Sequence, residues 1–97
     1  MRLMLRFSVA TEPGNKMIKD GEVGKVLPAM LEAMKPEAAY WYGDQGMRAG
    51  LFVFTAAESS DITRFSELLW MAGCTSVEVF PVMNQEELMK GLAAAAI

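Results

Sequence analysis

The sequence of 97 residues contains no histidine. Histidine is the commonest proton shuttle at neutral pH and the commonest protein ligand of metals and haem. The single cysteine, Cys74, has no partner for an internal disulfide, which favours a reducing cytoplasm and predicts a buried core thiol. The nine methionines are spread along the chain, as expected for core packing and not for a metal-binding tract. We therefore expect a cytoplasmic protein without a metal or a cofactor.

The chain also has neither a long apolar run nor a basic cluster. No segment approaches the ~20 apolar residues that a membrane-spanning helix needs, and Arg6 interrupts the apolar run at the N-terminus, unlike in a signal peptide. Nine basic residues are scattered among twelve acidic ones and give a net charge of −3. Nucleic acids and anionic membranes demand a basic stripe, because neutralised phosphates supply most of the affinity. We therefore expect neither a nucleic acid nor a membrane as a partner.

Apolar residues, by contrast, make up 53% of the chain, and their spacing predicts the secondary structure. The predicted strands cover residues 2–9, 38–42, 48–55 and 76–80. One helical segment lies between the first two strands, a second lies between the last two, and a tail helix follows the fourth strand. This order is the split βαβ, or ferredoxin-like, layout. We expect residues 1–97 to form a single α+β domain with an antiparallel sheet.

The first helical segment contains residues that interrupt helices. Residues 11–15 predict a turn, and apolar side chains then recur at helical spacing over residues 17–34. Gly24 costs up to about 1 kcal/mol inside a helix, and Pro28 removes a backbone donor. We expect either a kink near Gly24 or two helical pieces, the second starting just before Pro28. The segment should end at Lys35, because the residue before a proline avoids the helical conformation.

Capping signals mark the other two helices. Ser59-Ser60-Asp61 predicts the start of the second helix, and Gly73 is placed as its C-terminal cap. Asn84 and Glu87 have the spacing of a capping box, so they predict the start of the tail helix.

The ferredoxin-like order makes the first and third strands central, and we expect these two to run parallel. The alternation of side chains predicts that one face is covered by helices and carries Leu3, Leu5, Phe7, Leu51, Val53, Val77 and Val79. The opposite face is predicted to carry Met4, Arg6, Ser8, Trp41, Arg48, Gly50, Phe52, Phe54, Glu78 and Phe80. An exposed face this apolar indicates a ligand or partner surface. Packing against a second copy would be isologous, the commonest symmetry of soluble homodimers.

The hairpin between the middle strands determines where two tyrosines point. A two-residue turn at Asp44-Gln45 would pair Tyr42 with Met47 and turn Tyr40 and Tyr42 towards the helix layer. Slipping the register by one residue would instead turn both phenols to the other face, as possible proton donors.

The layout and its local sequence resemble the dimeric α/β barrel superfamily, and within it one of the small bacterial families. The resemblance covers nearly the whole chain, with local matches at residues 36–40, 77–83 and 86–88. It implies a homodimer in which two ferredoxin-like chains pack sheet to sheet around a small-molecule cavity. Members include cofactor-free monooxygenases, muconolactone isomerase-like enzymes, haem-degrading enzymes and binding proteins, so the shared fold does not transfer one function. The histidine that several of these proteins use is absent here.

The second face supplies the candidate site. We expect the barrel cavity to contact its ligand through Arg6, Trp41, Arg48, Phe52 and Glu78. Arg6 and Glu78 either form a cross-strand ion pair that closes one end of the barrel, or act as an anion anchor and a base. Trp41 either borders a pocket left by Gly50 or fills that gap as part of the core.

Three functions follow from this arrangement. The leading hypothesis is a cytoplasmic homodimer that binds a small, partly apolar ligand. The first alternative is an enzyme of the cofactor-free isomerase or monooxygenase type, in which Glu78 or a tyrosine moves the proton. Desolvation raises the pKa of a carboxylate, although a neighbouring arginine opposes that shift. The second alternative is a purely structural dimer whose cavity is filled by its own side chains.

Overall fold

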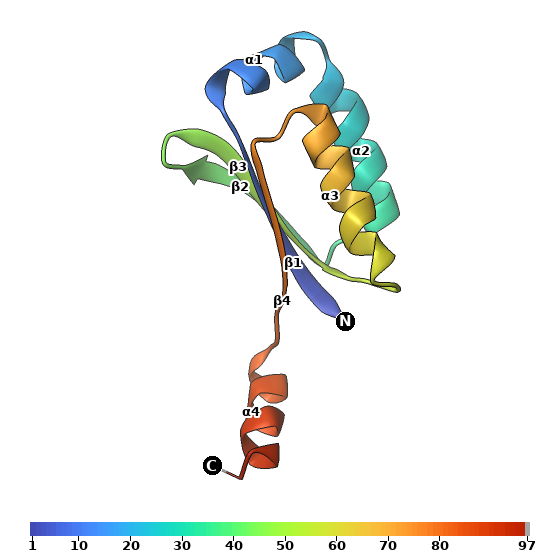
Figure 1. Ribbon diagram of the computed structural model, residues 1–97, viewed down its shortest axis with the longest axis vertical. Helices are drawn as coiled ribbons and strands as arrows, with labels where there is room; N and C mark the ends of the chain where they lie inside the picture. The colour runs from blue at the N-terminus through green and yellow to red at the C-terminus, as the bar shows by residue number, and fades with distance from the viewer. Residues whose placement is uncertain (97) are drawn as a thin grey trace.

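The computed structural model describes residues 1–96, so Ile97, the last residue of the expected domain, lies outside the described part of the chain. The elements follow one another as β1 (Arg2–Val9), α1 (Thr11–Lys19), α2 (Glu22–Met34), β2 (Ala38–Asp44), β3 (Met47–Thr55), α3 (Ser60–Ala72), β4 (Ser76–Pro81) and α4 (Gln85–Ala94). This order confirms the predicted ferredoxin-like α+β fold. Helices α1, α2 and α3 lie on one face of the sheet, and α4 projects from the end of β4 (Figure 1).

The sheet has the strand order β2-β3-β1-β4, and every neighbouring pair is antiparallel. The prediction that β1 and β3 are central is confirmed, but the prediction that they run parallel is wrong. The helical connection returns the chain so that β2 runs parallel to β1, with one strand between them. The tight hairpin then reverses the chain, and β3 must therefore run against β1.

The first helical segment consists of two helices, as one of the two alternatives predicted, but its boundaries differ from those expected. Residues 11–15 form the beginning of α1 and not a turn, because Pro13 stands in the first helical turn, where its missing N–H is not needed. The break occurs at Gly21, whose φ of 75° is left-handed, and not near Gly24. Helix α2 continues through Pro28; this residue and Gly24 are exposed, so water can reach the carbonyl that Pro28 leaves unpaired.

The β2–β3 hairpin turns at Gln45-Gly46, where φ is 52° and 78°. Two positive φ values define the type I′ turn that suits the twist of a hairpin, and glycine adopts its second position readily. The expected turn at Asp44-Gln45 was wrong, and Tyr42 pairs with Ala49 instead of Met47. The pairing partner of each β2 residue is thus two positions further along β3 than expected. Because side chains alternate with a period of two residues, the same side chains of β2 and β3 still share a face.

The hairpin as a whole is turned over relative to β1, which corrects the predicted faces. Directly opposed residues of an antiparallel pair share a face, and β1 pairs Leu5 with Phe52 and Phe7 with Gly50. The helix-covered face therefore contains five residues expected on the other side: Trp41, Arg48, Gly50, Phe52 and Phe54. The open face, opposite the helices, instead contains Tyr40, Tyr42, Leu51 and Val53, beside Met4, Arg6, Glu78 and Phe80.

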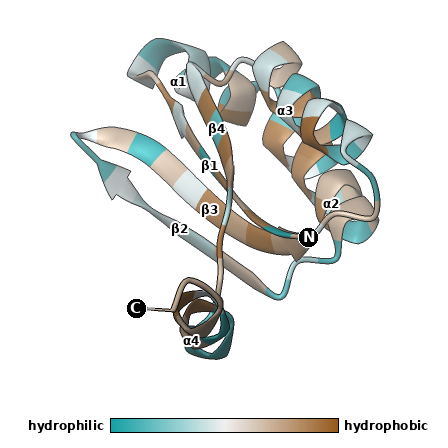
Figure 2. Cartoon of the chain, turned by 60° about the horizontal axis from the view of Figure 1, so that its bottom comes forward, coloured by the Kyte–Doolittle hydropathy of each residue, from teal (hydrophilic) through white to brown (hydrophobic). Residues whose placement is uncertain are grey.

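The core lies between the sheet and the helices. Its buried members are Leu3, Leu5, Met30, Met34, Phe52, Phe54, Phe65, Leu69 and Cys74. Figure 2 shows strongly hydrophobic stretches of β1, β3 and α3 along this layer. Complete burial of a side chain such as Leu5 or Phe52, each 0% exposed, stabilises the fold by about 1.5–3 kcal/mol.

The predicted helix start at Ser59-Ser60-Asp61 is confirmed in position, but no side chain caps α3 there. Asp61 instead accepts hydrogen bonds from the N–H groups of residues 57 and 58, before the helix, at 3.1 and 3.3 Å. Gly73 ends α3 with a φ of 114°, as predicted. Asn84 and Glu87 form the expected capping box at the start of α4. Helix α4 itself contains no buried residue. Within residues 1–96, no helix has the length and apolarity needed to cross a membrane.

Candidate functional site

The five predicted ligand contacts are divided between the two faces of the sheet. Arg6 and Glu78 are directly opposed on β1 and β4 and belong to the open face. Trp41, Arg48 and Phe52 belong to the helix-covered face. The sheet separates the two groups, so the single site expected from the sequence becomes two candidate sites.

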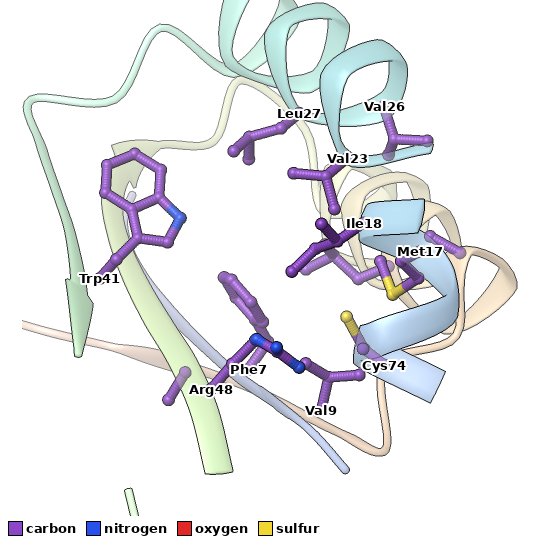
Figure 3. Close-up of a pocket in the computed structure, with 14 residues that line it drawn as sticks. Phe7, Val9, Met17, Ile18, Val23, Val26, Leu27, Trp41, Arg48 and Cys74 are labelled. Carbon is purple, nitrogen blue, oxygen red and sulfur yellow. The ribbon is translucent and has the colours of Figure 1, made fainter. Parts of the chain in front are cut away.

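The first candidate is a pocket of 140 Å³ on the helix-covered side of the sheet, which we call the helix-side pocket. Its lining comes from β1, α1, α2, β2, β3, α3 and the chain after α3, and consists of Phe7, Val9, Gly14, Met17, Ile18, Val23, Val26, Leu27, Trp41, Arg48, Ala49, Leu69, Ala72 and Cys74. Figure 3 shows Trp41 across the pocket from Leu27, Val23 and Ile18. Ile18 and Trp41 are each 53% exposed, so the pocket is partly open to solvent.

An aromatic stack forms one wall of the helix-side pocket. The rings of Phe7 and Phe52 are stacked with centroids 5.6 Å apart, and Trp41 meets Phe52 edge to face at 5.9 Å. Phe52 is fully buried and supports Phe7 from below without lining the pocket. A Cβ at Gly50 would lie 2.6 Å from the Phe7 ring, so this glycine lets Phe7 lie flat against β3. The gap at Gly50 is filled by Phe7, while Trp41 stays half-exposed at the pocket rim.

Among the fourteen described residues that line the helix-side pocket, Arg48 is the one with a charged side chain. Its Nη2 donates a hydrogen bond to Oδ1 of Asn15 at 3.0 Å. Its Nη1 lies 2.7 Å from the position that a Cβ of Gly14 would take, and Val9 lies 3.4 Å from the same position. The absence of a side chain at Gly14 therefore gives the guanidinium its place beside the apolar wall.

Cys74 also lines the helix-side pocket, as a buried thiol. Burial raises the pKa of Cys74 to about 11, so the thiol is neutral at physiological pH and has little nucleophilic character. The predicted buried core thiol is confirmed. Over residues 1–96, histidine, cysteine, aspartate and glutamate side chains form no group able to hold a metal ion.

The second candidate is a polar cluster on the open face. The neighbouring phenol of Tyr42 raises the pKa of Arg6, and the charges of Glu78 and Asp44 add to this effect. The ion-pair contact of Arg6 is to Asp44 on β2, at 3.9 Å, although Glu78 is its opposed neighbour on β4. Tyr40 and Tyr42 are 65% and 37% exposed here, which corrects the expectation that they point to the helix layer.

The contribution of α1 and α2 to the helix-side pocket is not predicted by the sequence pattern. Met17, Val23 and Leu27 recur at the spacing of an ordinary apolar helix stripe. The signal that could have indicated their role is Gly21, because a break there lets two short helices meet the sheet at different angles.

No protein-family model and no curated protein matches the sequence. Solved structures similar to the chain include 5-chloro-2-hydroxyhydroquinone dehydrochlorinase from Burkholderia phenoliruptrix in complex with 2,5-dihydroxybenzoquinone, with a TM-score of 0.68 and 13% sequence identity over 90% of this chain and 98% of that chain. They also include At3g17210 from Arabidopsis thaliana, with a TM-score of 0.45 and 16% identity over 87% of this chain and 97% of that chain. The likeness to the dehydrochlorinase agrees with the ferredoxin-like α+β fold.

Proposed function

We propose that this protein is a homodimer that binds a small, partly apolar ligand in the helix-side pocket. The observation that carries the proposal is a concave, apolar wall left partly open beside Trp41 and Ile18. Small-molecule sites are typically concave and mostly apolar, with few polar groups that fix the ligand's orientation. Arg48 is such a group. The proposal transfers the ligand from the expected barrel cavity to the other side of the sheet.

The size of the helix-side pocket supports a ligand of about one ring. Its 140 Å³ is close to the roughly 150 Å³ of an engineered apolar protein cavity that binds benzene. The dehydrochlorinase of similar fold forms a complex with 2,5-dihydroxybenzoquinone, which is also a one-ring compound. The fold is therefore able to accommodate ligands of this size.

The open face supports the homodimer. No helix of residues 1–96 covers it (Figures 1 and 2), and Leu51, Phe80 and the exposed Tyr40 lie on it. Arg6 and Glu78 place charges of both signs on the same face, so a two-fold-related copy would meet complementary charges. Isologous packing of this kind is the commonest way to pair identical chains, and the resemblance to the dimeric α/β barrel superfamily implies the same arrangement.

Native mass spectrometry of the protein purified without refolding tests ligand and dimer together. We expect a dimer that retains a small molecule. Trp41→Ala should lose the retained molecule, while the matched control Trp70→Ala should keep it, because Trp70 is 46% exposed on α3 and does not line the pocket. Absence of any retained or added small ligand, or equal retention by both variants, would contradict binding in the helix-side pocket.

The dimer has its own test. Tyr40→Glu should convert the dimer to a monomer in a dilution series measured by light scattering, because it places a new charge in the proposed interface. Leu68→Glu, a similar change at a 43% exposed position on α3, should leave the dimer intact. A monomeric wild-type protein at all concentrations would refute the homodimer.

The cluster on the open face supports a second candidate, proton transfer within the proposed dimer. Tyr42, Asp44 and Glu78 surround Arg6 there, so an acid, a base and an anion-binding group lie together. Because the sheet separates this cluster from the helix-side pocket, its substrate would be a second small molecule, bound between the paired open faces. Glu78→Gln should then abolish conversion of such an added molecule while leaving the dimer and the ligand of the helix-side pocket unchanged. Unchanged conversion would leave the cluster with only a role in dimerisation.

A further inference from the structure

Arg48 has an unpaired charge at the edge of the helix-side pocket. Within residues 1–96, Arg2, Arg6 and Arg64 each have a carboxylate oxygen within 4.0 Å, whereas Arg48 has none. Its hydrogen-bond partner is the neutral amide of Asn15. A guanidinium has five N–H donors in a fixed fork, which suits a carboxylate. Most of the hydrogen-bonding capacity of Arg48 is therefore free.

The position of the guanidinium is determined by its neighbours. Asn15 holds Nη2 at 3.0 Å, and the space above Gly14 accommodates Nη1. These contacts keep the cation beside Val9 and the apolar pocket wall, although the residue itself is exposed, so water and salt screen its attraction to an anion. A ligand that fills this pocket would place its apolar part against Phe7 and any anionic part at Arg48.

Resting on the function proposed above, we propose that the helix-side pocket takes a monocyclic carboxylate: the ring lies between Phe7 and the α2 side chains, and the carboxylate binds Arg48. The 140 Å³ volume limits the apolar part to about one ring.

Benzoate and benzamide form a matched pair of probes, because they differ in charge and hardly in size. Titrations followed by the indole N–H signal of Trp41 in nuclear magnetic resonance spectra give both affinities at the pocket. We expect benzoate to bind about 2- to 5-fold more tightly than benzamide, because the ion pair with the exposed Arg48 is partly screened by solvent. Added salt should reduce this preference without weakening benzamide binding.

Two variants test whether Arg48 is responsible. Arg48→Gln should make the two affinities equal, and Arg64→Gln, a remote exposed control on α3, should leave the preference intact. Gly14→Ala should reduce benzoate affinity about 2- to 5-fold, towards that of benzamide, without loss of stability. The added methyl group displaces the guanidinium, while alanine favours the helix. This variant keeps the arginine, so a folding defect caused by losing it cannot explain the result.

The outcomes separate this proposal from the proposed function. Equal affinities of the wild-type protein for benzoate and benzamide, or a preference that survives Arg48→Gln, would overturn the carboxylate assignment while leaving the pocket as a binding site. Binding of neither probe would also overturn it; the proposed function would then stand only if native mass spectrometry showed a retained molecule that Trp41→Ala removes.

Discussion

Gly50 is the position where a single added methyl group should have the sharpest effect on this fold. Its Cβ would lie 2.6 and 2.7 Å from two atoms of the Phe7 ring and 3.3 Å from the backbone carbonyl oxygen of Tyr40. Phe7 cannot retreat towards the core, because it is stacked on the fully buried Phe52. In Gly50→Ala the ring must therefore turn outwards, into the helix-side pocket.

Two opposing effects determine the size of the change. Replacing a glycine whose backbone conformation alanine also adopts stabilises a protein by about 0.4–1 kcal/mol. Overpacking a well-filled core costs about 1–3 kcal/mol. The steric effect is the larger one, so we expect a net loss of about 1–2 kcal/mol in the free energy of unfolding. For a chain of this length, that corresponds to a fall of roughly 5–15 °C in the melting temperature.

Urea denaturation followed by circular dichroism measures this loss. All samples must have one protein concentration, because dimerisation would make the apparent stability concentration-dependent. Gly43→Ala is the matched control: Gly43 is also in a strand, and among residues 1–96 no heavy atom outside its chain neighbours lies within 4 Å of its Cβ position. It should be neutral or slightly stabilising.

A double-mutant cycle identifies the clash partner. Phe7→Leu should lower the free energy of unfolding of the wild-type protein. In the Gly50→Ala background the same change should lower it less, or even raise it, because the clash is relieved. The difference between the two backgrounds is the coupling energy, about 0.5–3 kcal/mol. The reasoning would be refuted if Gly50→Ala were as stable as Gly43→Ala, or if Phe7→Leu had the same cost in both backgrounds.

Three further changes should have effects of different kinds. Gly24→Ala should stabilise the protein by about 0.5–1 kcal/mol in the same denaturation assay, because its Cβ position is open and alanine favours the helix. Asn84→Ala should destabilise α4 alone, by about 1 kcal/mol, because α4 buries no residue against the sheet. Faster hydrogen exchange over residues 85–94 would measure this loss. Burial raises the pKa of Cys74 from 9.0 to about 11. The thiol of the unfolded chain therefore ionises at lower pH than that of the folded protein, and stability should fall as the pH rises from about 9 to 11. Cys74→Ala should make this fall smaller, as measured by denaturation midpoints at about pH 8 and pH 10.5.

Several parts of the fold could be predicted from the local sequence. The alternation of Leu3, Leu5 and Phe7 identified β1 and its buried face, and these residues do face the helices. Asn84 with Glu87, and Gly73, identified helix ends because capping depends on a few neighbouring residues. The error at α1 has a local cause as well: a Pro-Gly pair is typical of a turn, yet it is also compatible with the first turn of a helix.

The candidate site was not readable in the same way. Residues 47–55 are apolar on both sides of the strand, so their pattern does not determine which side meets the helices. The pairing register between β1 and β3 determines which side of β3 faces the helices, and in this register Phe7 lies over Gly50. This contact joins residues distant in sequence, and it places the exposed Trp41 and Arg48 on the same face of the sheet as the helices.

The sequence by itself determined the order of elements, most helix ends, and a chain without histidine. Those properties depend on composition and on interactions within a few residues. Only the tertiary structure decided that Trp41 and Arg48 share a pocket with α1 and α2 while Arg6 and Glu78 lie on the opposite face. The physical reason is that a strand apolar on both sides takes its orientation from the packing of distant side chains.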